Sequence, residues 1–260
     1  MLSGKTALVV GVANRFSLAW GIAQALHGAG ARLMMSYQGE RVERSAQQLA
    51  ASLDGTLTGM MDANDDAQID ALFDRIQREM GGLDVLIHSV AWAPAETLSQ
   101  PFVSTSRQAF LATLETSAYS LTALAQRAAP LMTRRGGGSI LALTYLGGER
   151  VVPNYNVMGV AKAALDSSMK YLAYDLGPQN IRVNAISSGP VSTAAARGIS
   201  GFLKMEHHVT ASSPLRRKTD PAEVGATALF LCSEAARGIT GEVIHVDAGY
   251  NIMGTMALPD

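Results

Sequence analysis

The stretch VVGVANRFSLAWGIAQAL, residues 9–26, decides the fold. It has the pattern of an apolar strand, a turn at Gly11 and a helix that we expect to begin near Ser17 or Leu18. Serine is a good helix cap, and the free N–H groups at a helix N-terminus can hold a phosphate group. The pattern G-x-G-x-x-G is not met, because Ala13 stands at the second glycine position. An ordinary capped turn would look the same, so the rest of the chain must decide between the two interpretations.

Short apolar runs recur along the whole chain and alternate with helix-like stretches. Most runs are apolar at both parities, which suits strands that are covered on both faces, as in a parallel sheet. They lie at residues 6–12, 31–37, 56–62, 83–90, 139–145, 181–187 and 242–248. Apolar residues at helical spacing predict a helix over 66–80, and the two glycines at 81–82 end it. The pattern predicts one α/β domain over residues 1–260, a doubly wound, Rossmann-like parallel sheet of about seven strands with helices on both faces.

In such a sheet, the first turn between strand and helix is where dinucleotides bind. This position favours a pyrophosphate site at Gly11, Ser17 and Leu18 over an ordinary turn. At the end of the second strand, an acidic residue would bond the ribose of NAD, and a basic residue would accept the extra phosphate of NADP. The chain has Gln38, which is neutral and can still bond a ribose hydroxyl, with Arg41 nearby. We predict NADH as the cofactor, with NADPH as the alternative.

Asp62 follows the third predicted strand in MMDAND, residues 60–65. It therefore lies at the rim of the sheet where a cofactor binds. The structural alternative is a turn that Asp62 caps together with Asn64 and Asp65, and for Asp65 we predict this capping role.

The composition excludes several classes of function. The net charge is −1, from 21 basic and 22 acidic residues, so the whole chain offers no electrostatic case for binding nucleic acid. No stretch reaches the ~18 continuous apolar residues of a membrane helix, and the first apolar run is too short for a secretion signal. The single cysteine, Cys232, cannot form an internal disulfide, and we expect a buried, inert thiol in a cytoplasmic protein. We predict no membrane insertion and no metal site.

The stretch YNVMGVAK, residues 155–162, places a tyrosine and a lysine two helical turns apart. Seven residues along a helix bring a side chain back to within about 20° of the same direction, so Tyr155 and Lys162 would share one face. Met158 would lie between them, four residues before Lys162, where a short-spaced reductase carries its tyrosine. Tyr145 ends the preceding strand in LALTYLGG, where those enzymes carry a serine.

Each of these side chains alone has a structural interpretation, with Tyr145 as a buried strand aromatic and Lys162 as a surface charge. All three are predicted at the carboxyl end of the sheet, which favours a reductase site. A tyrosine hydroxyl can donate to an oxygen on which negative charge develops, and a lysine ammonium can hold ribose hydroxyls.

Several segments resemble the bacterial-type enoyl-acyl-carrier-protein reductases, a divergent branch of the short-chain dehydrogenase/reductase superfamily. They are GVANRFSLAWGIA (11–23), HSVAWAP (88–94), YNVMGVAK (155–162), RVNAISSGPV (182–191) and GEVIHVDAGY (241–250). The resemblance covers nearly the whole chain, and its most specific part is the Tyr-x6-Lys spacing with a methionine between. It implies hydride transfer from NADH to the trans-2,3 double bond of enoyl thioesters on acyl carrier protein, in fatty acid elongation.

The resemblance also implies roles for individual residues. Tyr155 would donate to the thioester carbonyl, Lys162 would bind the nicotinamide ribose, and Tyr145 would support substrate placement or proton delivery. Substrate contacts would come from Ala93, Tyr145, Tyr155, Met158 and Phe202. Cofactor contacts would come from Gly11, Ser17, Leu18, Gln38, Asp62, Ala63, Val90, Lys162, Val191, Ser192, Thr193, Ala194 and Ala195. Residues 190–214 would form a substrate lid, and a homotetramer would use helices such as 107–134 and 155–176 as interfaces.

The chain departs from the family pattern at a few positions. Ala91 stands where many relatives have glycine, which predicts a narrower pocket beside the nicotinamide. Ala248 also replaces a usual glycine, and we interpret this as a packing difference. The lid keeps only Lys204, with Arg197 nearby, of the basic residues that would meet an acidic carrier protein.

Two other functions stay open at this point. One is a ketoacyl or other carbonyl reductase of the same superfamily, against which Met158 stands because no tyrosine lies four residues before Lys162. The other is a non-catalytic dinucleotide-binding protein, against which the presence of both tyrosines and the lysine stands.

Overall fold

The computed structural model of the chain describes residues 1–193 and 201–254. Seven strands form one parallel sheet in the order β3-β2-β1-β4-β5-β6-β7. The strands are β1 (Thr6–Val10), β2 (Arg32–Tyr37), β3 (Leu57–Met60), β4 (Val85–His88), β5 (Gly138–Thr144), β6 (Ile181–Ser188) and β7 (Val243–Val246). Each corresponds to one predicted run, so the predicted fold class is confirmed.

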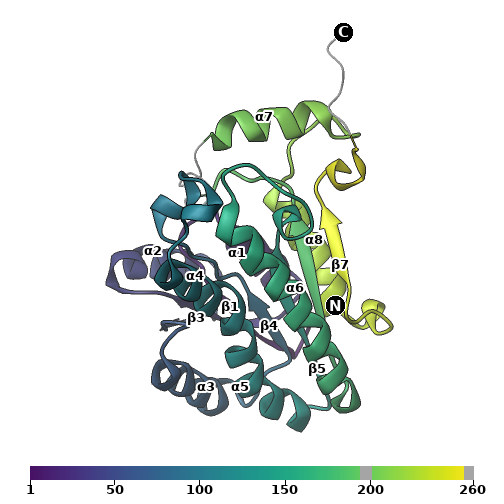
Figure 1. Cartoon of the computed structure of the whole chain (residues 1–260). Helices are drawn as coiled ribbons and strands as arrows, with labels where there is room; N and C mark the ends of the chain where they lie inside the picture. The colour runs from purple at the N-terminus through teal and green to yellow at the C-terminus, as the bar shows by residue number, and fades with distance from the viewer. Residues whose placement is uncertain (194–200, 255–260) are drawn as a thin grey trace.

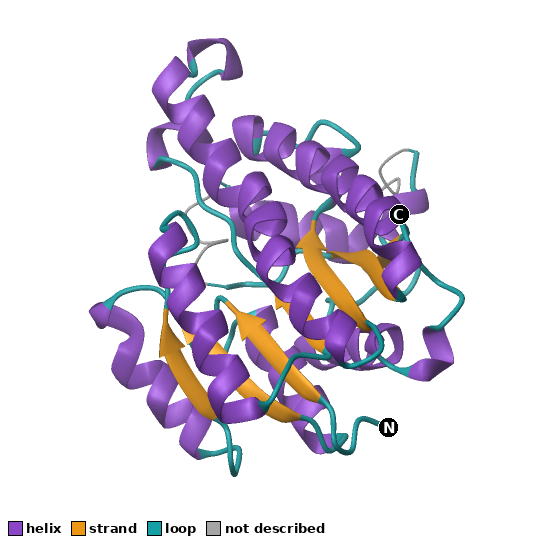
Figure 2. Cartoon of the chain, turned by 90° about the horizontal axis from the view of Figure 1, so that it is seen from below, coloured by secondary structure: helices purple, strands orange, loops and turns teal. Residues whose placement is uncertain are grey.

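Helices cover both faces of this sheet, which appears as a central layer of strands in Figure 2. The helices are α1 (Leu18–Gly28), α2 (Glu40–Ala51), α3 (Asp66–Met80), α4 (Arg107–Leu114), α5 (Ser120–Arg134), α6 (Asn156–Leu176), α7 (Phe202–Ser212) and α8 (Pro221–Cys232). Side chains of α1, α2 and α8 pack into the core on one face, and those of α3, α5 and α6 pack into the core on the other. In Figure 1, α7 lies at the top of the molecule, on the side to which the β7 arrow points.

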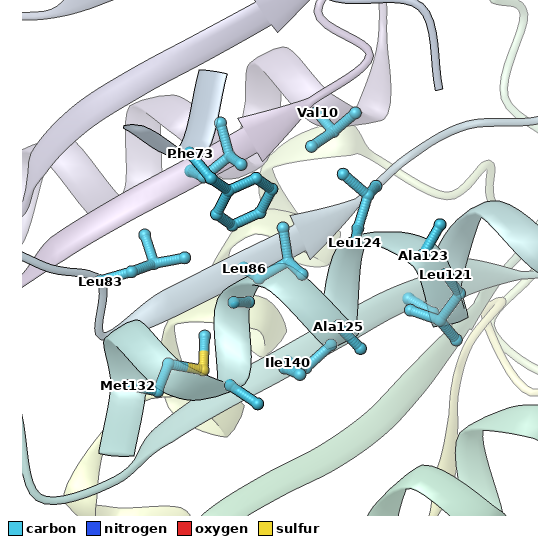
Figure 3. Packing of buried hydrophobic residues seen from close by; sticks show 14 of the residues in the cluster. Val10, Phe73, Leu83, Leu86, Leu121, Ala123, Leu124, Ala125, Met132 and Ile140 are labelled. Carbon is cyan, nitrogen blue, oxygen red and sulfur yellow. The ribbon is translucent and has the colours of Figure 1, made fainter. Parts of the chain in front are cut away.

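The strands are apolar at odd and even positions alike because helices cover both faces of the sheet. In β1, Leu8 and Val10 enter the cluster under α3, α5 and α6, whereas Ala7 and Val9 enter the cluster under α1 and α8. Figure 3 shows Val10 in the first cluster with side chains from α3, β4 and α5. Every side chain of this strand is therefore removed from water, and no alternation is left to see in its sequence.

Helix boundaries follow the predicted capping residues. The Ser17 hydroxyl accepts from the Trp20 N–H at 3.2 Å at the start of α1. Asp65 accepts from the N–H groups of Ala67 and Gln68 at the start of α3, so its predicted capping role is confirmed. Gly81 ends α3 with a φ of 77°, in the left-handed region that favours glycine.

Two further predictions concern what the chain lacks. Among residues 1–193 and 201–254, none of the helices combines the length and the apolar composition of a membrane crossing. The same residues bring no group of His, Cys, Asp and Glu side chains into an arrangement that could hold a metal ion. Cys232 is buried at the end of α8, and burial raises the pKa of its thiol to about 12, as expected for an inert cysteine.

Asp84 joins three segments at the amino ends of the strands. Its buried carboxylate accepts from Arg135 Nε at 2.8 Å, from the Thr6 N–H at 2.8 Å and from Lys5 Nζ at 3.2 Å. A buried carboxylate with both a cationic and a backbone donor is costly to disrupt, because its partners lose their acceptor.

We expect Asp84→Asn to lower the free energy of unfolding by about 2 kcal/mol, because the amide places a donor against Arg135. The matched control is Glu79→Gln, which breaks a solvent-exposed ion pair with Arg75 and should leave the free energy of unfolding nearly unchanged. Urea unfolding of both variants measures the difference. Equal losses would contradict the anchoring role of Asp84.

Ala248 has a φ of 58°, which is a left-handed backbone conformation. The choice between alanine and glycine at this position therefore affects the backbone, and not only the packing that the sequence suggested. We expect Ala248→Gly to raise the free energy of unfolding by about 0.5 kcal/mol, since it relieves the Cβ penalty. Ala71→Gly on the exposed side of α3 should instead lower it by about 0.5–1 kcal/mol. Thermal unfolding of the two variants checks the opposite signs.

Candidate active site

A cavity of about 570 Å³ opens at the carboxyl ends of β1, β4, β5 and β6. It includes the point where the strand order reverses between β1 and β4, which is where ligands bind in open parallel sheets. The predicted site residues that line it are Gly11, Ser17, Leu18, Gln38, Ala63, Val90, Ala93, Tyr145, Tyr155, Met158, Lys162, Val191, Thr193 and Phe202. Asp62 and Ser192 are not among the lining residues, and Ala194 and Ala195 lie outside the described residues.

Gly11 lies where the chain leaves β1 and crosses the end of β4. Its φ is 89°, and a Cβ atom there would collide with the Ser89 carbonyl oxygen. The following turn is held by Ser17, whose hydroxyl donates to the Asn14 carbonyl oxygen at 2.8 Å. The backbone at Gly11 and the N-terminus of α1 therefore form a concave wall of main-chain groups. Such a wall fits the pyrophosphate of a dinucleotide.

The residues that follow β2 and β3 differ in whether they line the cavity. Gln38 lines the cavity, whereas Arg41 is exposed outside it. Asp62 turns away into its own loop, where Oδ1 accepts from the Asn64 N–H at 2.9 Å. The turn-capping interpretation of Asp62 is therefore confirmed, and Ala63 is the residue of this loop that lines the cavity. A cofactor contact from Asp62 stays a prediction.

Tyr145 and Tyr155 meet edge to face, with ring centroids 5.0 Å apart and an interplanar angle of 69°. Tyr145 follows β5, and Tyr155 comes from the turn before α6. Gly147 makes this packing possible, because a Cβ atom there would collide with the Tyr155 ring. Gly159 does the same on the helix side, where a Cβ atom would come within 2.7 Å of the Gly147 carbonyl oxygen.

Tyr155 precedes α6 rather than lying on its first turn, which corrects the helical prediction. The helix begins at Asn156, whose φ of 46° interrupts the helical path between Tyr155 and the helix. The Asn156 side chain donates to the carbonyl oxygens of Thr97 and Gln100, each at 2.9 Å, and fixes this turn. Tyr155 and Lys162 still line the same cavity, but a locked turn, and not the helical repeat alone, brings them together.

Burial raises the pKa of both tyrosine hydroxyls. Tyr155 is 8% exposed, and burial first, with the neighbouring Tyr145 and Asp166, raises the pKa of its hydroxyl far above the ordinary value. Burial likewise raises the pKa of Tyr145 to about 12. Tyrosine hydroxyls of ordinary pKa are protonated at neutral pH, and the raised pKa values keep these two protonated, as hydrogen-bond donors, in alkaline solution as well.

Lys162 is 5% exposed and donates from Nζ to the Leu143 carbonyl oxygen at 2.8 Å. Burial lowers the pKa of its ammonium to about 8, although the charge of Asp166 opposes this shift. An ammonium group has three N–H donors, so this bond leaves donors for a ligand in the cavity. The expectation of a surface charge for Lys162 is excluded.

Helix α7 closes the upper side of the cavity through Phe202 and Met205, which both line it. The Tyr145 hydroxyl donates to Met205 Sδ at 3.6 Å, and the buried Glu206 pairs with Lys218 Nζ at 2.7 Å. The described parts of the predicted lid are thus seated on the body of the protein. Lys204 is exposed on α7, and Arg197 lies outside the described residues.

Sequence reasoning missed a π-helix in the middle of the predicted helix 107–134. Residues Glu115–Tyr119 form it between α4 and α5. Within it, the Ser117 hydroxyl accepts from the Trp92 N–H at 2.8 Å and donates to the Trp92 carbonyl oxygen at 2.9 Å. Single π-turns in helices occur frequently at functional sites, and this one holds the loop of Val90, Ala91 and Ala93 along the cavity wall. Only the small polar residues of ETSAY could have hinted at it.

Comparison with known proteins agrees with this geometry. The family model described as enoyl-(acyl carrier protein) reductase matches residues 11–251. The enoyl-[acyl-carrier-protein] reductase [NADH] FabI of Bacillus cereus is 52% identical over 256 residues, which are 98% of this chain and 99% of the relative. The chain belongs to the enoyl-(acyl carrier protein) reductase family. The predicted resemblance is confirmed.

Other members of the enoyl reductase family are nearly as similar. The FabI of Synechocystis is 50% identical over 256 residues, covering 97% of this chain and 98% of the relative. A crystal structure of the Bacillus cereus enzyme with NADP+ and indole naphthyridinone has a TM-score of 0.95 and covers 98% of this chain and 99% of that one. The Anaplasma phagocytophilum enzyme in complex with NAD has a TM-score of 0.95 at 47% identity, covering 99% of this chain and 97% of that one. The fold of this chain is therefore the fold of the enoyl reductases.

Proposed function

We propose that this protein is an NADH-dependent enoyl-[acyl-carrier-protein] reductase. It reduces the trans-2,3 double bond of enoyl thioesters carried on acyl carrier protein, a step of fatty acid elongation. The observation that carries this proposal is the cavity into which Tyr155, Met158 and Lys162 all open. Family membership and the names of the relatives support it.

The cofactor is held by main-chain and small side chains on one side of the cavity. Gly11, Ser17 and Leu18 would hold its pyrophosphate, Gln38 its adenine ribose and Lys162 its nicotinamide ribose, since all of them line the cavity. NADH, when bound, supplies the hydride that passes to C3 of the enoyl group. NADH rather than NADPH is supported by the NADH enzymes among the relatives and by Arg41, which does not line the cavity.

The protein stabilises the charge that develops on the substrate. Tyr155 donates its O–H to the thioester oxygen as that oxygen gains negative charge, and its burial makes the bond strong. Tyr145 packs against Tyr155 and supports substrate placement or proton delivery. Met158, Ala93 and Phe202 give the acyl group an apolar wall.

One assay separates this function from its alternatives. NADH oxidation is followed with a crotonyl thioester and then with an acetoacetyl thioester of acyl carrier protein. Oxidation with the crotonyl substrate alone supports the enoyl reductase. Oxidation with the acetoacetyl substrate alone indicates a ketoacyl reductase, and cofactor binding without either reaction indicates a non-catalytic protein. Repeating the assay with NADPH tests the cofactor choice.

The family resemblance also supports a homotetramer. Exposed aromatic side chains on α6 agree with an interface at this helix, since Tyr171 and Tyr174 are 72% and 82% exposed. Equilibrium sedimentation should give four times the chain mass of 27.4 kDa, and a monomer would contradict the proposal. We retain the cytoplasmic setting, which the single cysteine predicts, as part of this proposal. The proposed partner is acyl carrier protein, and no nucleic acid is expected to bind.

A further inference from the structure

Asp166 is a buried carboxylate that the reaction described above does not use. It lies on α6 one helical turn after Lys162 and is 9% exposed. Its Oδ1 atom is buried, and no hydrogen-bond partner for it exists among residues 1–193 and 201–254. A side chain of this kind needs a compensating charge, because an isolated buried carboxylate is unstable.

The loop before α6 encloses this carboxylate against the helix. At Gly148, a Cβ atom would lie 2.9 Å from the Ala163 N and 3.1 Å from Asp166 Oδ2. The absence of a side chain there lets Leu146–Gly148 cover the helix between Lys162 and Asp166. Both side chains are buried, and charges interact more strongly in a buried environment than in water.

Asp166 is also the only carboxylate, among the described parts of the chain, whose charge acts on Lys162. The other titratable groups near the ammonium are His88 on β4, on which the Lys162 charge acts, and Tyr155 and Tyr145, which line the same cavity as Lys162. Burial, with the Lys162 charge, lowers the pKa of His88 to about 3, and both tyrosines stay protonated. None of the three supplies negative charge at neutral pH.

We propose that Asp166 is a positioning residue whose negative charge keeps Lys162 protonated in the active site. The inference rests on the proposed function, because the ammonium matters only if Lys162 binds the cofactor ribose. Asp166 does not line the cavity and would act through Lys162.

The charges around Asp166 agree with this role. Burial raises the pKa of its carboxyl, whereas the Thr144 hydroxyl and the Lys162 charge lower it. Glu149 raises it from the following loop, and Lys170 lowers it from the next turn of α6. Glu149 is itself paired with His245 Nε2 at 2.9 Å near the surface. Lys162 is therefore the buried cation whose charge acts on Asp166, and the two charges oppose the neutralisation that burial imposes on both.

The small number of lysines allows a direct measurement. The chain has only Lys5, Lys162, Lys170, Lys204 and Lys218, so protein labelled with ¹³C-lysine gives a simple spectrum of the Cε atoms. We expect the Lys162 signal to titrate about one unit lower in Asp166→Asn than in the wild-type protein. Asp175→Asn, at an exposed position of the same helix, should leave it unchanged. An unaltered Lys162 titration in Asp166→Asn would overturn the proposal.

The catalytic consequence is tested in parallel. In Asp166→Asn, the fall of kcat/KM at alkaline pH should begin at a lower pH than in the wild type. NADH binding, measured by nucleotide fluorescence, should show the same change, and both should shift by as much as the Lys162 titration does. Asp166→Glu should restore both, whereas a purely structural loss would lower activity at every pH without moving this fall. If the wild-type protein did not reduce enoyl substrates, the proposed function would be wrong. The NMR titration would still show whether Asp166 keeps Lys162 protonated.

A reciprocal variant keeps the test valid if Asp166→Asn does not fold. In Lys162→Met, the Asp166 carboxyl loses its cation, so its ¹³Cγ signal, assigned through the backbone, should titrate at higher pH than in the wild type. An unchanged titration would show that the two groups do not interact and would refute the inference.

Discussion

Replacing Tyr155 by phenylalanine should lower kcat/KM for a carrier-linked enoyl substrate by about 100- to 1000-fold. The substitution removes one oxygen atom from a side chain that is otherwise held by the Tyr145 ring and by the covering loop at Gly147. The ring should keep its place, and the loss should fall on the transition state, because the donor acts on charge that appears only during the reaction. NADH affinity, measured by fluorescence, should change less than about 2-fold, since a few tenths of a kcal/mol is the expected indirect effect.

The matched control is Tyr119→Phe, which removes a hydroxyl from a tyrosine that is 56% exposed at the end of the π-helix. It should leave both kcat/KM and NADH affinity unchanged. If Tyr155→Phe retained nearly full activity, the oxyanion donor would have to be another group, and Tyr145 would be the first to test. If it lost NADH affinity as strongly as activity, the side chain would serve the cofactor instead.

Much of the fold was predictable because the sheet imposes its chemistry on the sequence. Strands buried on both faces must be apolar at both parities, so the runs around Leu8 and Leu86 stand out from helices such as α3. The site was predictable in outline for a related reason. Parallel strands end at one edge of the sheet, so residues that follow β1, β2, β4 and β5 must converge there.

Details that depend on tertiary hydrogen bonds were not predictable. The left-handed backbone of Asn156 is held by hydrogen bonds from its side chain to the carbonyl oxygens of Thr97 and Gln100. These partners lie far away in the sequence, so no local pattern predicts them. The π-helix at Glu115–Tyr119 is tied to Asn64 and Trp92, which are distant in the sequence. The sequence alone left open whether Asp62 caps its own turn, and the bond that it accepts from the Asn64 N–H shows that it does.

The other large effect is expected at Lys162, where function and stability should move in opposite directions. Both Lys162→Ala and Lys162→Met should raise the dissociation constant of NADH by about 10- to 100-fold, because they remove a charged donor from the ribose site. Fluorescence titration at pH 7 measures this, and normal NADH affinity would show that the ribose role is wrong. Lys170→Met, which removes an exposed lysine on the same helix, is the control and should bind NADH normally.

The stability of the same variant follows from the lowered pKa. Folding lowers the pKa of Lys162 from its ordinary value of 10.5 to about 8, so the folded state disfavours the charged form. The cost is fully present below pH 8 and is relieved as the pH rises from about 8 towards 10.5, since the unfolded chain binds more protons in that range. Lys162→Met removes the buried charge, and the Asp166 carboxyl, whose pKa burial raises, can take up a proton once its cation is gone. The free energy of unfolding of the apo protein at pH 7 should therefore rise by about 1–2 kcal/mol. The gain should shrink above pH 8, and urea unfolding at pH 7 and pH 9.5 tests both statements. A variant less stable than the wild type at pH 7 would mean that Asp166 and the Leu143 carbonyl oxygen already compensate the buried ammonium in full.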